Sequence, residues 1–163
     1  MEKFTGKVWV LGDDIDTDII IPTEYLALKT IDDMKQYGFS PLRPELAGQI
    51  QKGDIIVAGK NFGCGSSREQ AQEIIKALGV QCVIAKSFAR IFFRNAINNG
   101  LLLIEQPNLY DDIKEGDTIT VHMNKHVDYN SKEYPIAALP ENLMRIIQAG
   151  GLVGAMRKLN GLD

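Results

Sequence analysis

The chain has 163 residues, of which 45% are apolar and 24% charged, a composition typical of ordinary globular proteins that argues against disorder. The net charge is −3 and the lysines and arginines are scattered, so the sequence offers no basic stripe for a nucleic-acid backbone. The apolar runs are far shorter than the roughly 20 residues that span a bilayer, and the first residues lack an apolar signal core. We therefore expect one cytoplasmic domain covering residues 1–163, with neither a nucleic-acid nor a membrane partner.

The first third of the chain contains short elements separated by turns. Lys7–Leu11 (KVWVL) is rich in strand-forming residues, and it is followed by an acidic, turn-forming stretch, GDDIDTD. The apolar run Ile19–Ile21 is interpreted as the edge of a second strand. Residues 31–37 can form a short helix, and residues 38–44, with two prolines, are expected to form a surface loop.

The centre of the chain alternates between buried strands and amphipathic helices. Asp54–Ala58 (DIIVA) is an apolar run bounded by glycines, and Cys82–Ala85 and Leu101–Ile104 are similar runs. Between them, Ser67–Leu78 and Ser87–Asn98 carry apolar residues at helical spacing, with Ser87 in a position to cap the second helix. This order predicts a β-α-β-α-β unit.

The last third begins with residues 117–139, whose pattern predicts a β-meander. Pro140 is expected to begin a helix, and Leu152–Leu159 to form a short amphipathic segment. Because strands flank a central β-α-β-α-β unit and no linker or repeat interrupts the chain, we predict a single compact α/β domain of β/β/α build.

The strongest candidate site is the glycine-rich stretch Gly59–Ala71 (GKNFGCGSSREQA), which lies between an expected strand and an expected helix. Glycines permit positive φ and close ligand approach, so the N–H groups of Gly65, Ser66 and Ser67 can point at an anion. Arg68 adds an always-charged planar fork that suits a carboxylate. The stretch is therefore predicted to bind a small carboxylate or phosphate.

A structural interpretation of the same residues stays open. Ser66 followed by Glu69 fits a capping box, in which the serine caps the helix and the glutamate reaches back. Nucleotide binding is disfavoured, since the spacing matches neither a Walker loop nor GxGxxG.

The cysteines and histidines are weaker candidates. Cys64 is expected to be a small buried thiol rather than a nucleophile, because neither histidine lies near it in the sequence. His122 and His126, four residues apart in an expected hairpin, are interpreted as surface residues, so we predict no metal site there. Cys64 and Cys82 are too few for a disulfide framework or a self-contained set of iron or zinc ligands.

Three segments together resemble a known family. Gly12–Pro22 (GDDIDTDIIIP), Gly59–Ala71 and Ala85–Leu101 (AKSFARIFFRNAINNGL) are similar, in this order, to the signatures of the small subunits of isopropylmalate isomerase. Those subunits match the swivelling fourth domain of aconitase. The resemblance extends from Gly6 to about Leu159, and it implies the same swivelling-domain fold.

The resemblance also implies roles for individual residues. Ser66 matches the serine that acts as the catalytic base in aconitase-like enzymes, removing the proton beside a carboxylate. Ser67 and Arg68 match its substrate-binding neighbours. Gly65, whose N–H group the glycine-rich stretch already suggests for an anion, is expected to bind substrate beside them. Asp18 matches an acidic residue that would orient the serine and the arginine.

A further segment bears on substrate choice. Tyr25–Leu28 matches a loop that the family uses for this purpose, and it carries apolar Ala27 and Leu28 where homoaconitase-like small subunits carry arginine. Arg90 and Arg94 match a motif that we interpret as structural.

The resemblance implies a hydro-lyase that interconverts 2-isopropylmalate and 3-isopropylmalate in leucine biosynthesis. A 4Fe–4S cluster needs more thiolates than two cysteines supply, so we expect no cofactor on this chain and a cluster on a large partner subunit. The expected substrate is a small 2-hydroxy dicarboxylic acid. The alternatives are a small subunit of homoaconitase or of a methylmalate or dimethylmalate dehydratase, or a non-catalytic anion-binding module.

Overall fold

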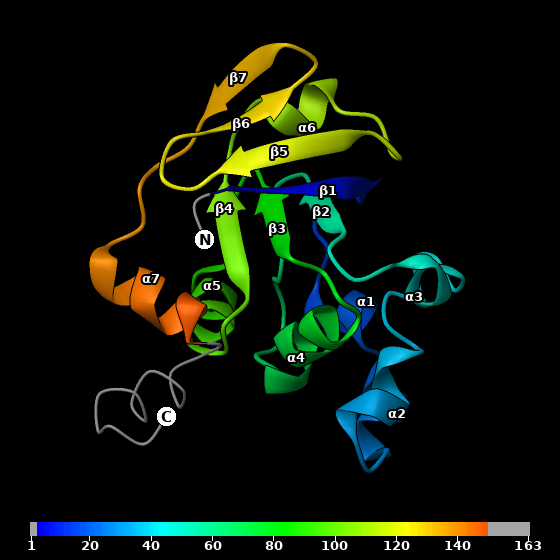
Figure 1. Cartoon of the computed structure of the whole chain (residues 1–163). Helices are drawn as coiled ribbons and strands as arrows, with labels where there is room; N and C mark the ends of the chain where they lie inside the picture. The colour runs from blue at the N-terminus through cyan, green and yellow to red at the C-terminus, as the bar shows by residue number, and fades with distance from the viewer. Residues whose placement is uncertain (1–2, 150–163) are drawn as a thin grey trace.

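The structure, a computed structural model, describes residues 3–149, and a single seven-stranded sheet organises it (Figure 1). The expected segment Leu152–Leu159 lies outside the described residues. The strands are β1 (Lys3–Val10), β2 (Ile55–Ala58), β3 (Cys82–Ala85), β4 (Leu102–Glu105), β5 (Thr118–His122), β6 (His126–Tyr129) and β7 (Lys132–Pro135). The helices are α1 (Thr17–Ile20), the 3-10 helix η1 (Thr23–Ala27), α2 (Ile31–Lys35), α3 (Leu46–Gln49), α4 (Glu69–Ala77), α5 (Arg90–Asn98), α6 (Leu109–Asp112) and α7 (Glu141–Gln148).

The sheet has a parallel half and an antiparallel half that meet at β1. Its strand order is β4-β3-β2-β1-β5-β6-β7. Strands β1 to β4 are parallel, with Val8 of β1 in register with Ile55 of β2, whereas β5 runs antiparallel to β1, with Phe4 opposite Val121. Figure 1 shows β5, β6 and β7 at one end of the molecule and α4 and α5 at the other. The α/β fold and the β-α-β-α-β centre are as predicted.

Two hydrophobic clusters lie on the two faces of the parallel strands. Along β2, Ile56 belongs to the cluster that contains residues of α4 and α5, whereas Ile55 and Val57 belong to the cluster that contains residues of β5, β6, β7 and α6. All four residues of β2 are buried, which explains its continuous apolar run. The parallel strands are thus covered on both faces, and their carboxyl ends remain free to hold loops.

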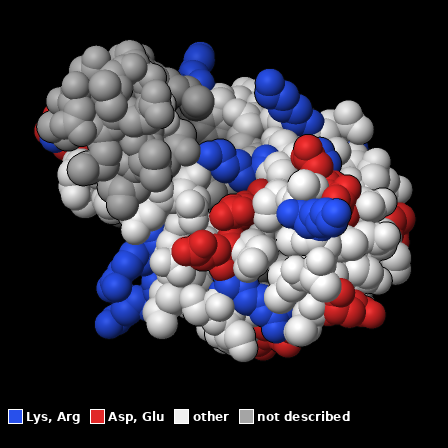
Figure 2. Space-filling model, turned by 90° about the horizontal axis from the view of Figure 1, so that it is seen from below, with Lys and Arg blue, Asp and Glu red and all other residues white. Residues whose placement is uncertain are grey.

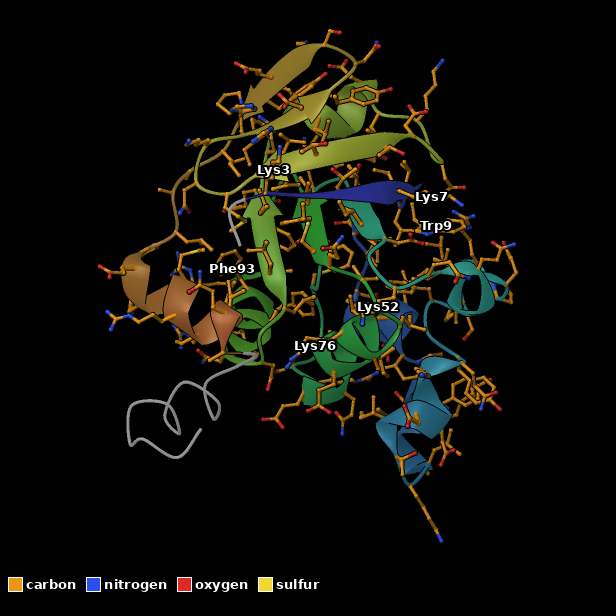
Figure 3. All side chains as sticks on the ribbon, viewed as in Figure 1. Lys3, Lys7, Trp9, Lys52, Lys76 and Phe93 are labelled. Atoms are coloured by element: carbon orange, nitrogen blue, oxygen red, sulfur yellow. The ribbon has the colours of Figure 1, made fainter. Side chains whose placement is uncertain are left out.

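The end of β1 is fixed by a buried polar contact. Trp9 Nε1 donates a hydrogen bond of 2.7 Å to Asp54 Oδ2, which also accepts one of 2.8 Å from the backbone N–H of Gln51. A buried carboxylate requires such partners. Figure 3 shows Trp9 beside Lys7, whose Nζ lies 4.6 Å from the centre of the indole ring.

Some predicted elements are wrong or incomplete. Ile19–Ile21 is not a strand edge, because Thr17–Ile20 forms α1, capped by the Asp16 side chain that accepts a hydrogen bond of 2.8 Å from Ile19 N. The second long helix begins at Arg90, with Ala89 as its N-cap residue in place of Ser87. The short helices α3 and α6 were not anticipated.

The charged side chains on the surface of the described residues are mixed in sign, as the scattered lysines and arginines of the sequence predict. Figure 2 shows acidic and basic side chains interspersed on the face that it presents. Among residues 3–149, no helix is both long and apolar enough to cross a membrane.

Candidate functional site

The segments that follow β1 and β2 are tied together by main-chain hydrogen bonds. Gly59 N donates to Gly12 O at 3.1 Å, and Asp14 N donates to Lys60 O at 2.8 Å. The carboxyl ends of parallel strands lie at one edge of a sheet, which brings these segments to the same place. Two of the three signature segments therefore meet at this edge.

The third signature segment, which follows β3, joins the same network. Phe62 N donates to Ser87 O at 3.0 Å, and Ala89 N donates back to Phe62 O at 2.9 Å. Lys86 N donates to Gly59 O at 3.1 Å. All three segments thus surround the stretch Gly59–Arg68, which we call the serine loop.

Three consecutive amide N–H groups of the serine loop have no acceptor in the described part of the chain. Gly65 has φ of +90°, and Thr17 holds the loop on both sides of this glycine, donating from its backbone N–H to Cys64 O at 2.9 Å and from its hydroxyl to Ser66 O at 2.7 Å. Within residues 3–149, no acceptor contacts the N–H groups of Gly65, Ser66 or Ser67. Exposed N–H groups held in this way can bind an anion.

The capping-box interpretation is wrong. Helix α4 begins at Glu69 with Arg68 as its N-cap residue, and no side chain makes a capping hydrogen bond. Ser66 and Ser67 are exposed on the loop before the helix. Their hydroxyl groups are consequently not used to cap the helix. Ser67 Oγ lies 3.5 Å from Asn95 Nδ2 of α5.

Arg68 is held by the segment that contains α1 and η1. Its Nη2 lies 2.6 Å from Asp18 Oδ1 and donates to Thr23 Oγ1 at 2.9 Å, while Nη1 donates to Ile21 O at 2.9 Å. The side chain is only 14% exposed. Three of the five guanidinium N–H groups are used in these contacts, so two remain for a ligand. The structure brings Asp18 and Arg68 together, as the resemblance implies.

A cavity of about 270 Å³ lies beside the serine loop. Ser67, Arg68 and Arg90 line it, together with Gln72 and Asn95, which the sequence analysis missed. The Gln72 amide is 1% exposed, and neither of its polar atoms has a partner among the described residues. One feature of the sequence could have identified Gln72 as a site residue: it lies four residues after Arg68, which places both on the same helical face.

The segment predicted to choose the substrate is the 3-10 helix η1 and its end. Ala27 is exposed, whereas Leu28 is half-buried and packs in the small cluster around Met34 and Ile74. Thr23, the first residue of η1, contacts Arg68 directly. The structure thus joins one end of η1 to the serine loop, and it leaves Ala27 facing solvent at the other end.

The two cysteines do not fit an iron–sulfur cluster. Burial raises the pKa of the half-buried Cys64 thiol, and Asp16 and Asp14 raise it further. Cys82 is fully buried within β3, and burial raises the pKa of its thiol far above the usual range. A cluster needs several accessible thiolates, which these two residues do not provide.

Comparisons with known proteins bear on the family and the fold. Residues 19–109 match the family model of the aconitase C-terminal domain. The chain is 77% identical to a 3-isopropylmalate dehydratase small subunit of Lachnospira eligens over 99% of both chains, and 50% identical to a small subunit 1 of Archaeoglobus fulgidus over 94% and 97%. A crystal structure of 3-isopropylmalate dehydratase from Methanocaldococcus jannaschii superposes with a TM-score of 0.91 at 39% identity, covering 98% of this chain and 96% of that one.

The serine loop depends on a glycine at position 63, which gives a first prediction. Gly63 has φ of +84°, and a Cβ atom there would lie 2.2 Å from Cγ of Phe92. Gly63→Ala should therefore lower the free energy of unfolding by about 2–4 kcal/mol, from the strained φ and the clash together. Urea denaturation measures this change.

Gly48→Ala is the matched control. Its Cβ would meet nothing within 4 Å, and Gly48 lies inside α3 without a positive φ. This variant should be neutral or gain up to about 1 kcal/mol in the free energy of unfolding. Equal effects of the two substitutions would contradict the proposed packing of the loop.

Proposed function

This chain belongs to the family of 3-isopropylmalate dehydratase small subunits, and from that premise we propose that it supplies the anion-binding, proton-abstracting half of a shared active site. The other half would lie on a large subunit. One observation carries the proposal: the free N–H groups of the serine loop lie next to an arginine whose orientation is already fixed. A non-catalytic anion-binding module would not account for the family membership.

The proposed ligand of this half-site is a carboxylate of the substrate. Arg68 has two N–H groups left for it, and the loop amides of Gly65, Ser66 and Ser67 offer further donors. Asp18 and Thr23 hold the guanidinium in place, so little side-chain entropy has to be lost when the carboxylate binds. This fixed geometry favours the doubly negative aci-carboxylate that forms when the neighbouring proton leaves.

Ser66 is the proposed base. It is exposed, its hydroxyl does not cap α4, and its carbonyl oxygen is held by Thr17, which fixes the residue without occupying the side chain. Serine is a weak base in water, but nearby N–H dipoles and Arg68 stabilise its alkoxide form. The same N–H groups and Arg68 would thus stabilise both the alkoxide of Ser66 and the aci-carboxylate of the substrate.

We propose that the 4Fe–4S cluster lies on the large subunit. The chemistry that the cluster supplies when bound is Lewis-acid assistance to the departing hydroxyl group. The small-subunit name of the relatives supports a large partner, and the two poorly suited cysteines support the division of labour. The cytoplasmic location stays a prediction.

The proposed substrates are 2- and 3-isopropylmalate, interconverted by dehydration and rehydration in leucine biosynthesis. The dehydratase names of the relatives support this choice over homoaconitase or the methylmalate and dimethylmalate dehydratases. The apolar residues Ala27 and Leu28 support it as well, because an isopropyl group gains about 0.8 kcal/mol for each buried methylene-sized unit. A third carboxylate would lose its water there, and the nearest cation in the sequence is Lys29, which carries its charge on a flexible, exposed side chain rather than on a planar guanidinium.

The division between two subunits can be tested directly. The chain expressed alone should be folded, colourless and inactive, and anaerobic addition of a cluster-bearing large subunit should restore isopropylmalate turnover. Ultraviolet-visible absorption, iron and sulfide content, and the turnover rate measure these outcomes. Stoichiometric iron and sulfide, or full hydratase activity, on the solitary chain would refute the proposal.

The role of Ser66 gives a further prediction. Ser66→Ala should lower kcat of the assembled enzyme by about 10²–10⁴-fold, the usual effect of removing a positioned general base. Its melting temperature should change little, because the side chain makes no capping hydrogen bond. Ser40→Ala, which removes a hydroxyl group outside the proposed site, serves as the control. A Ser66 variant with normal kcat and lower stability would assign the serine a structural role.

Substrate choice is tested at position 27. Ala27→Arg should shift the ratio of kcat/KM toward a homocitrate-type tricarboxylate, because the guanidinium can pair with the extra carboxylate. Glu24→Gln, also at an exposed position of η1, changes the net charge by the same +1 and controls for the charge change on the same element. A wild-type preference for the tricarboxylate, or an equal shift in both variants, would count against the assignment.

A further inference from the structure

Four potential metal ligands share the outward face of the antiparallel half of the sheet. His122 at the end of β5 lies directly opposite His126 at the start of β6, and Asp128 of β6 lies directly opposite Glu133 of β7. Val127, between His126 and Asp128, points into the core. The alternation of a strand therefore places both histidines and both acids on the same side.

The side chains of this group, which we call the histidine cluster, converge on one carboxylate. His122 Nε2 lies 2.6 Å from Asp128 Oδ2, and His126 Nε2 lies 3.0 Å from Asp128 Oδ1. Glu133 Oε2 lies 3.3 Å from His126 Nε2. The two imidazole rings are 4.6 Å apart between their centres. One ligand atom each from His122, His126 and Asp128 falls within 4.8 Å of the others.

The two carboxylates of the cluster are an unfavourable pair of like charges unless a protonated imidazole or a bound cation balances them. Asp128 and Glu133 are like charges at directly opposite positions of neighbouring strands, an arrangement that destabilises a sheet. Two neutral imidazoles and two carboxylates together would neutralise a divalent ion. On the other side of β5, Lys3 lies opposite His122, at the start of β1 (Figure 3). Among the described residues, Lys3 makes no contact with either carboxylate.

We propose that His122, His126 and Asp128 bind a divalent transition-metal ion such as Zn²⁺, with Glu133 beside the ion. Imidazole nitrogen with carboxylate oxygen is a ligand set that suits zinc, whereas calcium and magnesium prefer oxygen alone. Tetrahedral zinc separates neighbouring N and O ligands by about 3.4 Å. The two contacts with Asp128 would open by less than about 1 Å, and ligand atoms up to 4.8 Å apart would close by up to about 1.4 Å. The side chains are 23% to 45% exposed, which leaves room for this adjustment.

The site acts as a brace for the β5–β6 hairpin. The tight turn between the two histidines contains Asn124 with φ of +64°, and Lys125 N donates to His122 O at 3.1 Å across it. An ion held by β5 and β6 at once links the two strands beyond their main-chain hydrogen bonds. An ion that binds only the folded chain stabilises it in proportion to the logarithm of its concentration over Kd.

The test uses the full chain, stripped of metal with a chelator. Titration of Zn²⁺ in competition with a chromophoric chelator should give one ion per wild-type chain, and thermal unfolding should shift upward with added Zn²⁺. His122→Asn, His126→Asn and Asp128→Asn should each weaken binding by at least about 10–100-fold, since even groups that merely support a ligand have effects of that size. The upward shift in melting temperature should disappear with them.

Two controls separate this site from others. Lys125→Ala removes an exposed charge from the same turn and should keep the stoichiometry. The double variant His122→Asn/His126→Asn reports any binding through the cysteines. Because the chain has only two histidines, Zn²⁺ should shift two imidazole spin systems in nuclear magnetic resonance spectra. Unchanged affinity in the double variant, undisturbed imidazole signals, or no saturable wild-type binding would overturn the proposal.

Discussion

The site depends on the way three loops hold one another through their main chains. Gly59 links the first and second loops by donating to Gly12 O, and it also links the second and third loops by accepting from Lys86 N. These bonds use no side chain, so the loops can keep one arrangement while their surface residues vary. The close approach has a steric requirement, since a Cβ on Gly59 would lie 1.8 Å from Asp13 Oδ1.

Upon this framework, two consecutive residues of one segment hold the serine loop and Arg68. Thr17 fixes the carbonyl groups on both sides of Gly65, and Asp18, the next residue, meets Arg68. Consecutive residues of α1 therefore position both the backbone donors and the cation. Helix α1 itself is stabilised by Asp16, the N-cap residue before it, whose carboxylate caps its first turn. A four-residue helix thus organises the surface that we propose binds the substrate carboxylate.

Much of the fold follows from local pattern, and the errors have physical causes. Strand Cys82–Ala85 was predicted with its observed bounds because glycine and apolar signals agree there. Ile19 and Ile20 resemble a strand because they are β-branched, yet the cap that Asp16 supplies favours a helix. The sequence does not predict that α4 begins at Glu69 rather than at Ser67, since Ser66 followed by Glu69 fits a capping box. For the site, resemblance supplied Asp18 and Arg68 as partners, but the burial of Gln72 and the approach of Asn95 to Ser67 arise from packing between α4 and α5.

The contact between Thr23 and Arg68 links η1 to the serine loop. Thr23 of η1 shares the guanidinium with Asp18, so a carboxylate bound to the remaining N–H groups of Arg68 is linked to η1 through this contact. Thermodynamic linkage is reciprocal. If ligand binding stabilises η1 by a given free energy, then a partner surface that stabilises η1 strengthens ligand binding by the same free energy. Under the function proposed above, the residues that contact the substrate's side chain and the residue that binds its carboxylate are thereby energetically coupled, so a substitution at one would alter the contribution of the other.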